Sequence, residues 1–135
     1  MSKPDCLTIL LCESVVEDAR SHNKCILNTY NTISAPQFPT MQDRFTVFVS
    51  LTDGRGQQPV EVRFVRDNDE PVFSIRGVVK FQNPLDVIDL VLDLRQVPLP
   101  GAGPYAIQLR INDELIRERR VEVREIKPSL PGGNK

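Results

Sequence analysis

The sequence is poor in histidine, the side chain that enzymes use most often for proton transfer near neutral pH. It has no Trp and a single His, His22, among its 135 residues. Histidine is the side chain whose ordinary pKa lies nearest to neutral pH, and it is the commonest general acid or base. His22 stands in the polar stretch RSHNK, which is typical of a solvated loop. We therefore expect a protein without enzymatic activity and without catalytic residues.

Cysteine is also scarce, with only Cys6, Cys12 and Cys25. An odd number without repeated spacing is typical of reduced thiols, and it predicts a cytoplasmic protein. Structural zinc sites usually pair cysteines two to four residues apart, a spacing that is absent here. In a strand, Cys6 and Cys12 would share a face but lie about 20 Å apart. We predict no metal site and no cofactor; Cys12 or Cys25 with His22 and Glu13 is the thiol site that stays open.

Long hydrophobic runs and an excess of one charge are absent. The formal net charge is −1, and the apolar run from Leu7 to Leu11 is too short for a secretion signal or a membrane span. Near the C-terminus, arginines and glutamates alternate, which is typical of a soluble strand face rather than a nucleic-acid surface. We expect neither nucleic-acid nor membrane binding. The residues concerned are Arg110, Arg117, Arg119, Arg120, Arg124, Glu114, Glu118, Glu122 and Glu125.

Hydrophobic residues alternate with polar ones in much of the chain. This period of two predicts half-buried β-strands, and Gly, Asn, Asp and Pro clusters between the runs predict turns. The runs are RFTVFVSL, PVEVRF, FSIRGVVKF and YAIQLRI. In the last strand, ELIRERRVEVREI, the apolar phase slips between Ile116 and Val121. We predict a β-bulge near Glu118–Arg120 to explain this slip.

Four segments are less regular. LTILLC and KCILNTYNTI read as strands, and ESVVEDARSHN between them is either a wide hairpin loop or one helical turn. Residues 84–95 are ambiguous, because Asn83 and Pro84 suit a helix start whereas Leu90, Leu92 and Leu94 alternate as in a strand. Since the surrounding pattern is all β, we favour the strand.

These features together predict an all-β protein. We expect an antiparallel immunoglobulin-like β-sandwich of about seven to eight strands, with room for one short helix. A single sandwich domain is expected over residues 6–126, after an N-terminal extension of residues 1–5 and before a flexible tail of residues 127–135.

The stretch PLPGAGPYAIQLRI suggests a particular structural device. In immunoglobulin-like folds, a tyrosine near the start of a late strand often turns back and bonds the backbone of the preceding crossover. Gly103 and Tyr105 stand at that place, before a regular strand and one final hairpin. We therefore interpret them as a tyrosine corner; the alternative is a ligand loop lined by Tyr105.

The chain also resembles a known family. LTILLCESVVED, then FP, then LPGAGPYAIQLRINDELIRERRVEV are similar to a family of small bacterial all-β proteins classed as a domain of unknown function. The resemblance extends over residues 6–126. It implies an all-β fold in a bacterial cytosol, and it implies no activity or catalytic residue.

Protein association is the function that the sequence favours. The open edges of a sandwich can add a strand from a protein partner or from a second copy in a homo-oligomer. We take Arg117, Arg119, Arg120 and Phe48 as the candidate partner surface. The alternative is a small-molecule or calcium-binding sandwich that uses the turns at 53–57 and 67–70, with Asp67, Asp69 and Glu70 as oxygen ligands.

Overall fold

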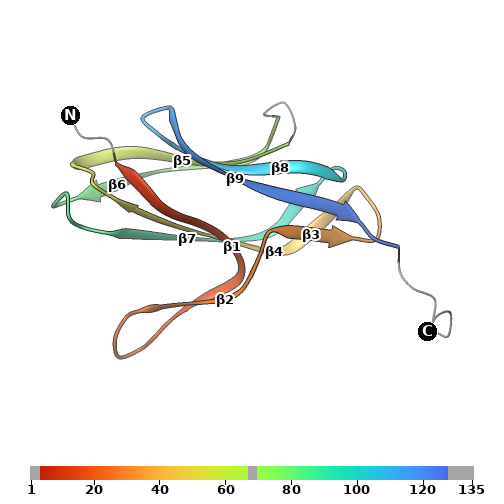
Figure 1. Ribbon diagram of the computed structural model, residues 1–135, viewed down its shortest axis with the longest axis horizontal. Coiled ribbons are helices and arrows are strands. Elements are labelled where there is room, and N and C mark those ends of the chain that lie inside the picture. The colour runs from red at the N-terminus through yellow and green to blue at the C-terminus, as the bar shows by residue number, and fades with distance from the viewer. Residues whose placement is uncertain (1–3, 67–69, 128–135) are drawn as a thin grey trace.

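The computed structural model describes residues 4–66 and 70–127, and these form nine strands and no helix (Figure 1). The strands are β1 (Asp5–Glu17), β2 (Lys24–Tyr30), β3 (Thr32–Ala35), β4 (Thr40–Thr52), β5 (Gly56–Arg66), β6 (Pro71–Phe81), β7 (Ile88–Leu99), β8 (Gly103–Ile111) and β9 (Glu114–Glu125). Asp5 is part of β1 and pairs with Thr52 of β4. Except for Lys127, the predicted C-terminal tail lies outside the described residues.

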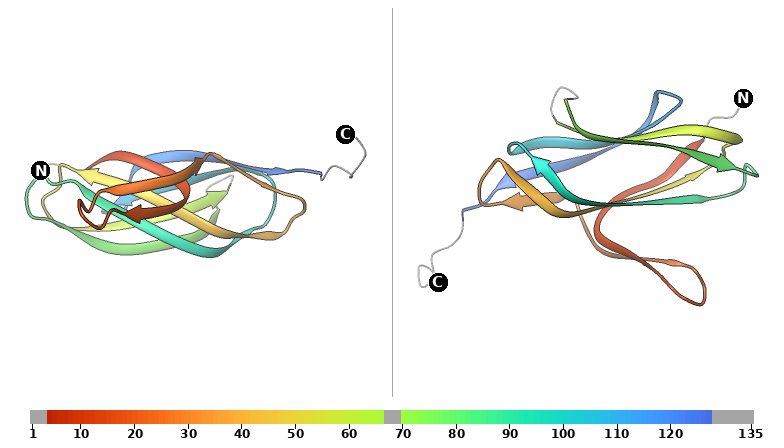
Figure 2. Two further views of the ribbon diagram at one scale, coloured as in Figure 1. Left: turned by 90° about the horizontal axis from the view of Figure 1, so that it is seen from below. Right: turned by 180° about the vertical axis from the view of Figure 1, so that it is seen from behind.

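The strands form two sheets that pack face to face (Figures 1 and 2). One sheet has the order β2-β1-β4-β7 and the other has the order β3-β9-β8-β5-β6. All neighbours are antiparallel except β3 and β9, which run parallel. This arrangement confirms the predicted immunoglobulin-like sandwich. The strand number is higher than expected because KCILNTYNTI contributes β2 to one sheet and β3 to the other.

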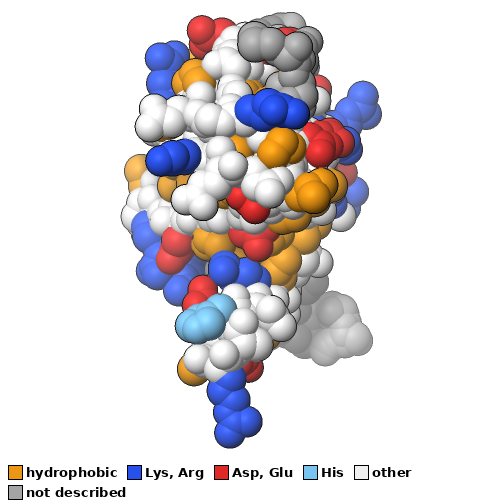
Figure 3. Space-filling model, turned by 90° about the vertical axis from the view of Figure 1, so that its left-hand side faces the viewer, with side chains coloured by type: hydrophobic (Ala, Val, Ile, Leu, Met, Phe, Trp, Pro, Cys, Tyr) orange, Lys and Arg blue, Asp and Glu red, His pale blue; other side chains and the backbone are white. Residues whose placement is uncertain are grey.

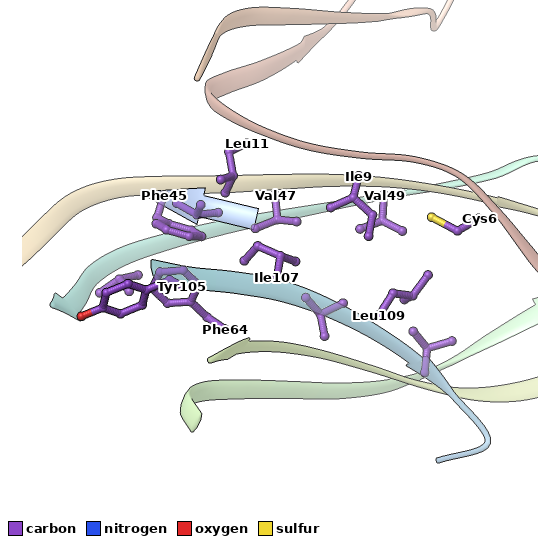
Figure 4. Packing of buried hydrophobic residues seen from close by; sticks show 14 of the residues in the cluster. Cys6, Ile9, Leu11, Phe45, Val47, Val49, Phe64, Tyr105, Ile107 and Leu109 are labelled. Atoms are coloured by element: carbon purple, nitrogen blue, oxygen red, sulfur yellow. The ribbon is translucent and has the colours of Figure 1, made fainter. Parts of the chain in front are cut away.

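The core lies between the sheets and is built by the inward positions of the alternating runs. Phe45 of β4 contacts rings from the opposite sheet, with centroid distances of 4.8 Å to Phe64 and 5.9 Å to Phe73. Phe64 also stacks on Tyr105 at 5.0 Å. Figure 4 shows aliphatic side chains continuing this layer along both sheets. They include Ile9, Leu11, Val47, Val49, Ile107 and Leu109, all buried.

The ambiguous segment forms a turn and then a strand. The Asn83 side chain accepts a hydrogen bond from the Leu85 amide at 2.9 Å, and the Asp86 amide donates to the Asn83 carbonyl. The capping chemistry of Asn83 therefore closes a turn and starts no helix. From Ile88 onward, β7 pairs with β4, which confirms the strand interpretation.

Two β-bulges change which face certain residues occupy. In β9, Leu109 pairs with Arg117 and Arg110 with Leu115, so the bulge lies at Ile116 and the predicted position at Glu118–Arg120 is wrong. The bulge adjoins the tight turn at residues 112–113 and keeps Ile116 packed against the core.

The second bulge lies in β1, between Cys6 and Thr8. Because it reverses the alternation, Cys6 joins the core whereas Cys12 lies on the opposite face, next to β4. The expectation that these two cysteines share a face is therefore wrong.

Tyr105 links the start of β8 to the preceding crossover. Its hydroxyl donates to the Gly101 carbonyl at 2.7 Å and accepts from the Gly101 amide at 3.3 Å. The Arg66 guanidinium lies over the ring, 5.7 Å from its centroid. Gly103 has a φ of 136°, a conformation that side chains rarely adopt, so glycine suits this position.

We expect Tyr105→Phe to lower the free energy of unfolding by about 1–3 kcal/mol, because it leaves the Gly101 backbone without its partner. Urea denaturation measures this change. Tyr30→Phe is the matched control, since the Tyr30 hydroxyl makes no hydrogen bond of good geometry with a described residue. Equal losses in both variants would contradict a specific role for the Tyr105 hydroxyl.

Candidate functional site

The structure does not gather the predicted partner surface in one place. Phe48 lies on the four-stranded sheet and is only 8% exposed. Arg117, Arg119 and Arg120 belong to β9 in the other sheet. Arg119 and Arg120 are adjacent in the strand, so their side chains point to opposite faces.

Arg119 is occupied within the fold. One guanidinium nitrogen donates to the Ile9 carbonyl of β1 at 3.1 Å, and another donates to the side chain of Asn31. Beyond its pairing with β4, β1 has a neighbour in β2 only from Leu11 onward. Arg119 thus bonds a carbonyl where the edge of β1 is open, and it holds the two sheets together rather than facing a partner.

Charged side chains on the outer face of the five-stranded sheet also pair with one another, as the contacts of Glu61 show. Glu61 is only 6% exposed, and its carboxylate accepts from Ser74 and, at 2.8 Å, from Arg63. Arg76 lies 3.5 Å from the same oxygen. The hydrogen bonds from Arg63 and Ser74 lower the pKa of Glu61 to about 2. These charges stabilise one another, so this face offers no obvious site.

Glu61 should make stability depend on acidity. Because its pKa is lower in the folded state than the ordinary 4.5, its contribution is complete above pH 4.5 and is lost as the pH falls toward 2. We expect Glu61→Gln to flatten the dependence of the urea midpoint on pH across this window. Glu122→Gln, at an exposed ion pair with Arg124, is the control and should change the slope less.

The most unusual feature is a hairpin that leaves the sandwich. β1 pairs with β4 as far as Cys12 opposite Thr46, and then continues only with β2, from Ser14 opposite Leu27 to Glu17 opposite Lys24. We call residues 13–29 the arm. Figure 1 and the right view of Figure 2 show the arm projecting from the body.

The end of the arm settles the undecided loop. Asp18 accepts hydrogen bonds from the amides of Arg20 and Ser21 at 2.8 and 2.9 Å, and the Asp18 amide donates to the Asn23 carbonyl. ESVVEDARSHN is therefore a hairpin, as the first alternative stated. Its tip also closes with a single α-turn, because the His22 amide donates to the Asp18 carbonyl at 2.9 Å.

The arm exposes apolar side chains and one sheet edge. Val16 is 47% exposed and Leu27 is 43% exposed, and Cys25 opposite Val16 is exposed as well. Within the described part of the chain, β2 has β1 as its only neighbour. Figure 3 shows the arm below the body, with the single histidine in pale blue. A two-stranded hairpin is only marginally stable alone, so these groups favour a further contact.

A groove of about 490 Å³ lies at the base of the arm. It is lined by the arm, by β3 and by the first part of β4, including Glu13, Tyr30, Ile33, Gln42 and Arg44. Burial raises the pKa of Tyr30 to about 12. The Gln42 amide lies near the Tyr30 hydroxyl but makes no hydrogen bond of good geometry with it.

The carboxylates of the groove already have partners. Glu13 accepts from Asn28 at 3.1 Å, and Asp43 accepts from Gln96 at 2.6 Å. Arg44 stands directly opposite Arg95 on β7, an arrangement of like charges that is unfavourable without a counter-charge.

In the thiol alternative, Cys12 and His22 do not lie together. His22 contacts Glu17 at 2.8 Å, and the Cys12 thiol points to the Thr46 carbonyl. Cys12 precedes Glu17 by five residues, about 16 Å along a strand. Burial raises the pKa of the Cys6 and Cys12 thiols, and Asp93 raises that of Cys12 further.

The proposed calcium turns are only partly described. Asp67 and Asp69 lie outside the described residues, and Glu70 pairs with Arg66 at 3.8 Å. Asp53, in the other turn, has a φ of 63°. Residues 4–66 and 70–127 contain no cluster of three or more His, Cys, Asp or Glu side chains that could hold a metal ion.

Thiol labelling tests this placement of the cysteines. We expect a disulfide reagent to modify Cys25 rapidly in the folded protein and to modify Cys6 and Cys12 only after unfolding, because burial disfavours their thiolates. Rapid modification of two or three thiols before unfolding would contradict it, and Cys25→Ser identifies the fast one.

Comparison with known proteins assigns a family. The model of DUF6941, a family of unknown function, matches residues 7–124. The chain belongs to this family. This match confirms the predicted resemblance. Because the function of DUF6941 is unknown, the match assigns no activity to the chain. No curated protein matches the sequence. None of the described residues form a helix that is long and apolar enough to cross a membrane.

Two solved structures resemble the chain in fold. A β-glucosidase from Listeria innocua, crystallised with isofagomine, matches with 12% identity and a TM-score of 0.52 over 94% of this chain. This chain spans only 17% of that enzyme. An immunoglobulin-like protein from Pseudomonas aeruginosa matches with 14% identity and a TM-score of 0.40, over 90% of this chain and 97% of that chain. At these identities the likeness concerns the fold alone.

Proposed function

We propose that this protein is a non-enzymatic interaction module that binds a protein partner or a second copy of itself through the arm. The observation that carries the proposal is the departure of β1 from β4 after Cys12. It exposes Val16 and Leu27 on a hairpin whose outer strand edge is open.

The composition of β2 supports this role. Proteins usually protect an exposed strand edge with charges, proline or a bulge. β2 has the sequence KCILNTY, and its only charged residue, Lys24, already pairs with Glu17 at 3.1 Å. The edge is therefore chemically suited to accept another strand, either from a partner or from a second β2.

The polar groups elsewhere support a role without catalysis. His22 is held by Glu17, and the thiols of Cys6 and Cys12 are buried with raised pKa values. Free thiols suit a reducing compartment, and with the likeness to small bacterial proteins they favour a bacterial cytosol. The near-neutral charge of −1 favours neither nucleic acid nor a membrane surface as the partner.

The arm can be tested by substitution. We expect Val16→Asp combined with Leu27→Asp to abolish recovery of partner proteins from source-cell lysate and to abolish any dimer measured by light scattering, because the changes place charges in the contact. Val78→Asp is the control: Val78 is 66% exposed on β6, away from the arm. Thermal unfolding checks that both variants are folded.

If the native chain is monomeric and recovers the same proteins as the double variant, the arm is not an interaction surface. Loss of partners in Val78→Asp as well would likewise contradict a role specific to the arm.

A further inference from the structure

The groove at the base of the arm occupies the position of a missing strand. β1 and β4 pair in register up to Cys12 opposite Thr46. If that register continued, Ser14 would lie opposite Arg44. Ser14 instead pairs with Leu27 in the arm, so β4 has β7 beside it at Arg44 but no strand of residues 4–66 or 70–127 on its other side.

Along Thr40–Phe45, β4 pairs with β7 and with no second strand of the described residues. The Gln42 side chain donates to the Arg44 carbonyl at 3.1 Å, so this backbone acceptor is bonded within β4 itself. Thr32, Ile33 and Ser34 of β3 form another wall of the groove. β3 is itself an edge strand, since it pairs only with β9 in the described residues. The groove thus lies between the part of β4 that β1 does not cover and β3, the edge strand of the other sheet.

Arg44 is the side chain of the groove that favours a ligand with a negatively charged acceptor. Glu13 and Asp43 already accept from Asn28 and Gln96. Arg44 makes no ion pair with a described residue, and the Arg95 opposite it has Asp93 at 3.6 Å. A strand added beside β4 would place one side chain in the same row as Arg44 and Arg95. A carboxylate there would relieve the repulsion between the two guanidinium groups.

We propose that the groove is a strand-addition site for an extended segment of a partner protein, which pairs with β4 along Thr40–Phe45 and places an acidic side chain beside Arg44. Six residues of β4 offer about 20 Å of edge, enough for a short segment. The Tyr30 hydroxyl is buried at the same groove and can donate to this segment. This proposal shares with the proposed function the idea that the ligand is a protein, and it rests on that function in this respect alone. The binding strand differs, since the segment pairs with β4 and not with the edge of β2.

A displayed library of random 12-residue peptides is the probe. The full chain is used to select binders, and their affinities are measured by fluorescence anisotropy. We expect the selected peptides to share an Asp or Glu. Arg44→Glu should weaken them about tenfold, and a peptide with Lys at the shared position should regain affinity for that variant. Arg76→Glu, on the outer face of the other sheet, is the matched control and should bind like the native chain.

Gln42→Pro tests the backbone contact, since proline removes a backbone donor and is tolerated at open strand edges. We expect it to abolish binding while thermal unfolding shows a folded protein. If it does not fold, Arg44→Glu with the charge-reversed peptide decides the question.

The proposal is overturned if no peptide is enriched, or if enriched peptides bind Arg44→Glu and native protein equally. A second result also overturns the proposal. If the double variant Val16→Asp with Leu27→Asp binds the peptides weakly while Arg44→Glu and Gln42→Pro bind them normally, the peptides bind the arm and not the groove. That last result would leave the proposed function intact.

Discussion

The contact of Phe45 with the rings of Phe64 and Phe73 is the interaction on which the rest of the structure depends. It joins β4 of one sheet to β5 and β6 of the other, and Tyr105 extends the same cluster through Phe64. Phe45 immediately precedes Thr46, the first residue of β4 that pairs with β1. Because aromatic packing holds β4 at this point, the sandwich closes without β1 beside it. The chain is therefore free to send β1 outward as the arm.

The distribution of satisfied polar groups follows from this arrangement. Glu61 is bonded within the five-stranded sheet, and Arg119 links β9 to β1, so both reinforce the body of the sandwich. Several groups without good partners lie where β1 leaves β4: the Tyr30 hydroxyl, Arg44, the open strand edge and the apolar side chains of the arm. Glu61 Oε1, Arg110 Nε and Arg119 Nε in the five-stranded sheet also lack a hydrogen-bond partner among the described residues. The region that β1 leaves differs from them because an unpaired strand edge and exposed apolar side chains accompany its polar groups.

The alternating runs predicted most of the strands, because the inward side chains of each run are buried and the outward side chains remain exposed to solvent. The sequence also indicates the roles of Gly103 and Tyr105, since glycine and tyrosine at a strand start have a specific backbone requirement. The sequence does not show which of the predicted partner-surface residues are used inside the fold. A row of arginines in the sequence does not reveal that Arg119 bonds the Ile9 carbonyl, 110 residues away along the chain.

By itself the sequence determined the all-β class, the turns, the buried faces and the corner at Tyr105, because these depend on local alternation and on residues close in the chain. Only the tertiary structure decided where the bulges fall, which faces Cys6 and Cys12 occupy, and that β1 leaves β4 after Cys12. Each of these depends on pairing between distant strands. A one-residue shift in such pairing reverses the face of every later side chain, and no local pattern encodes it.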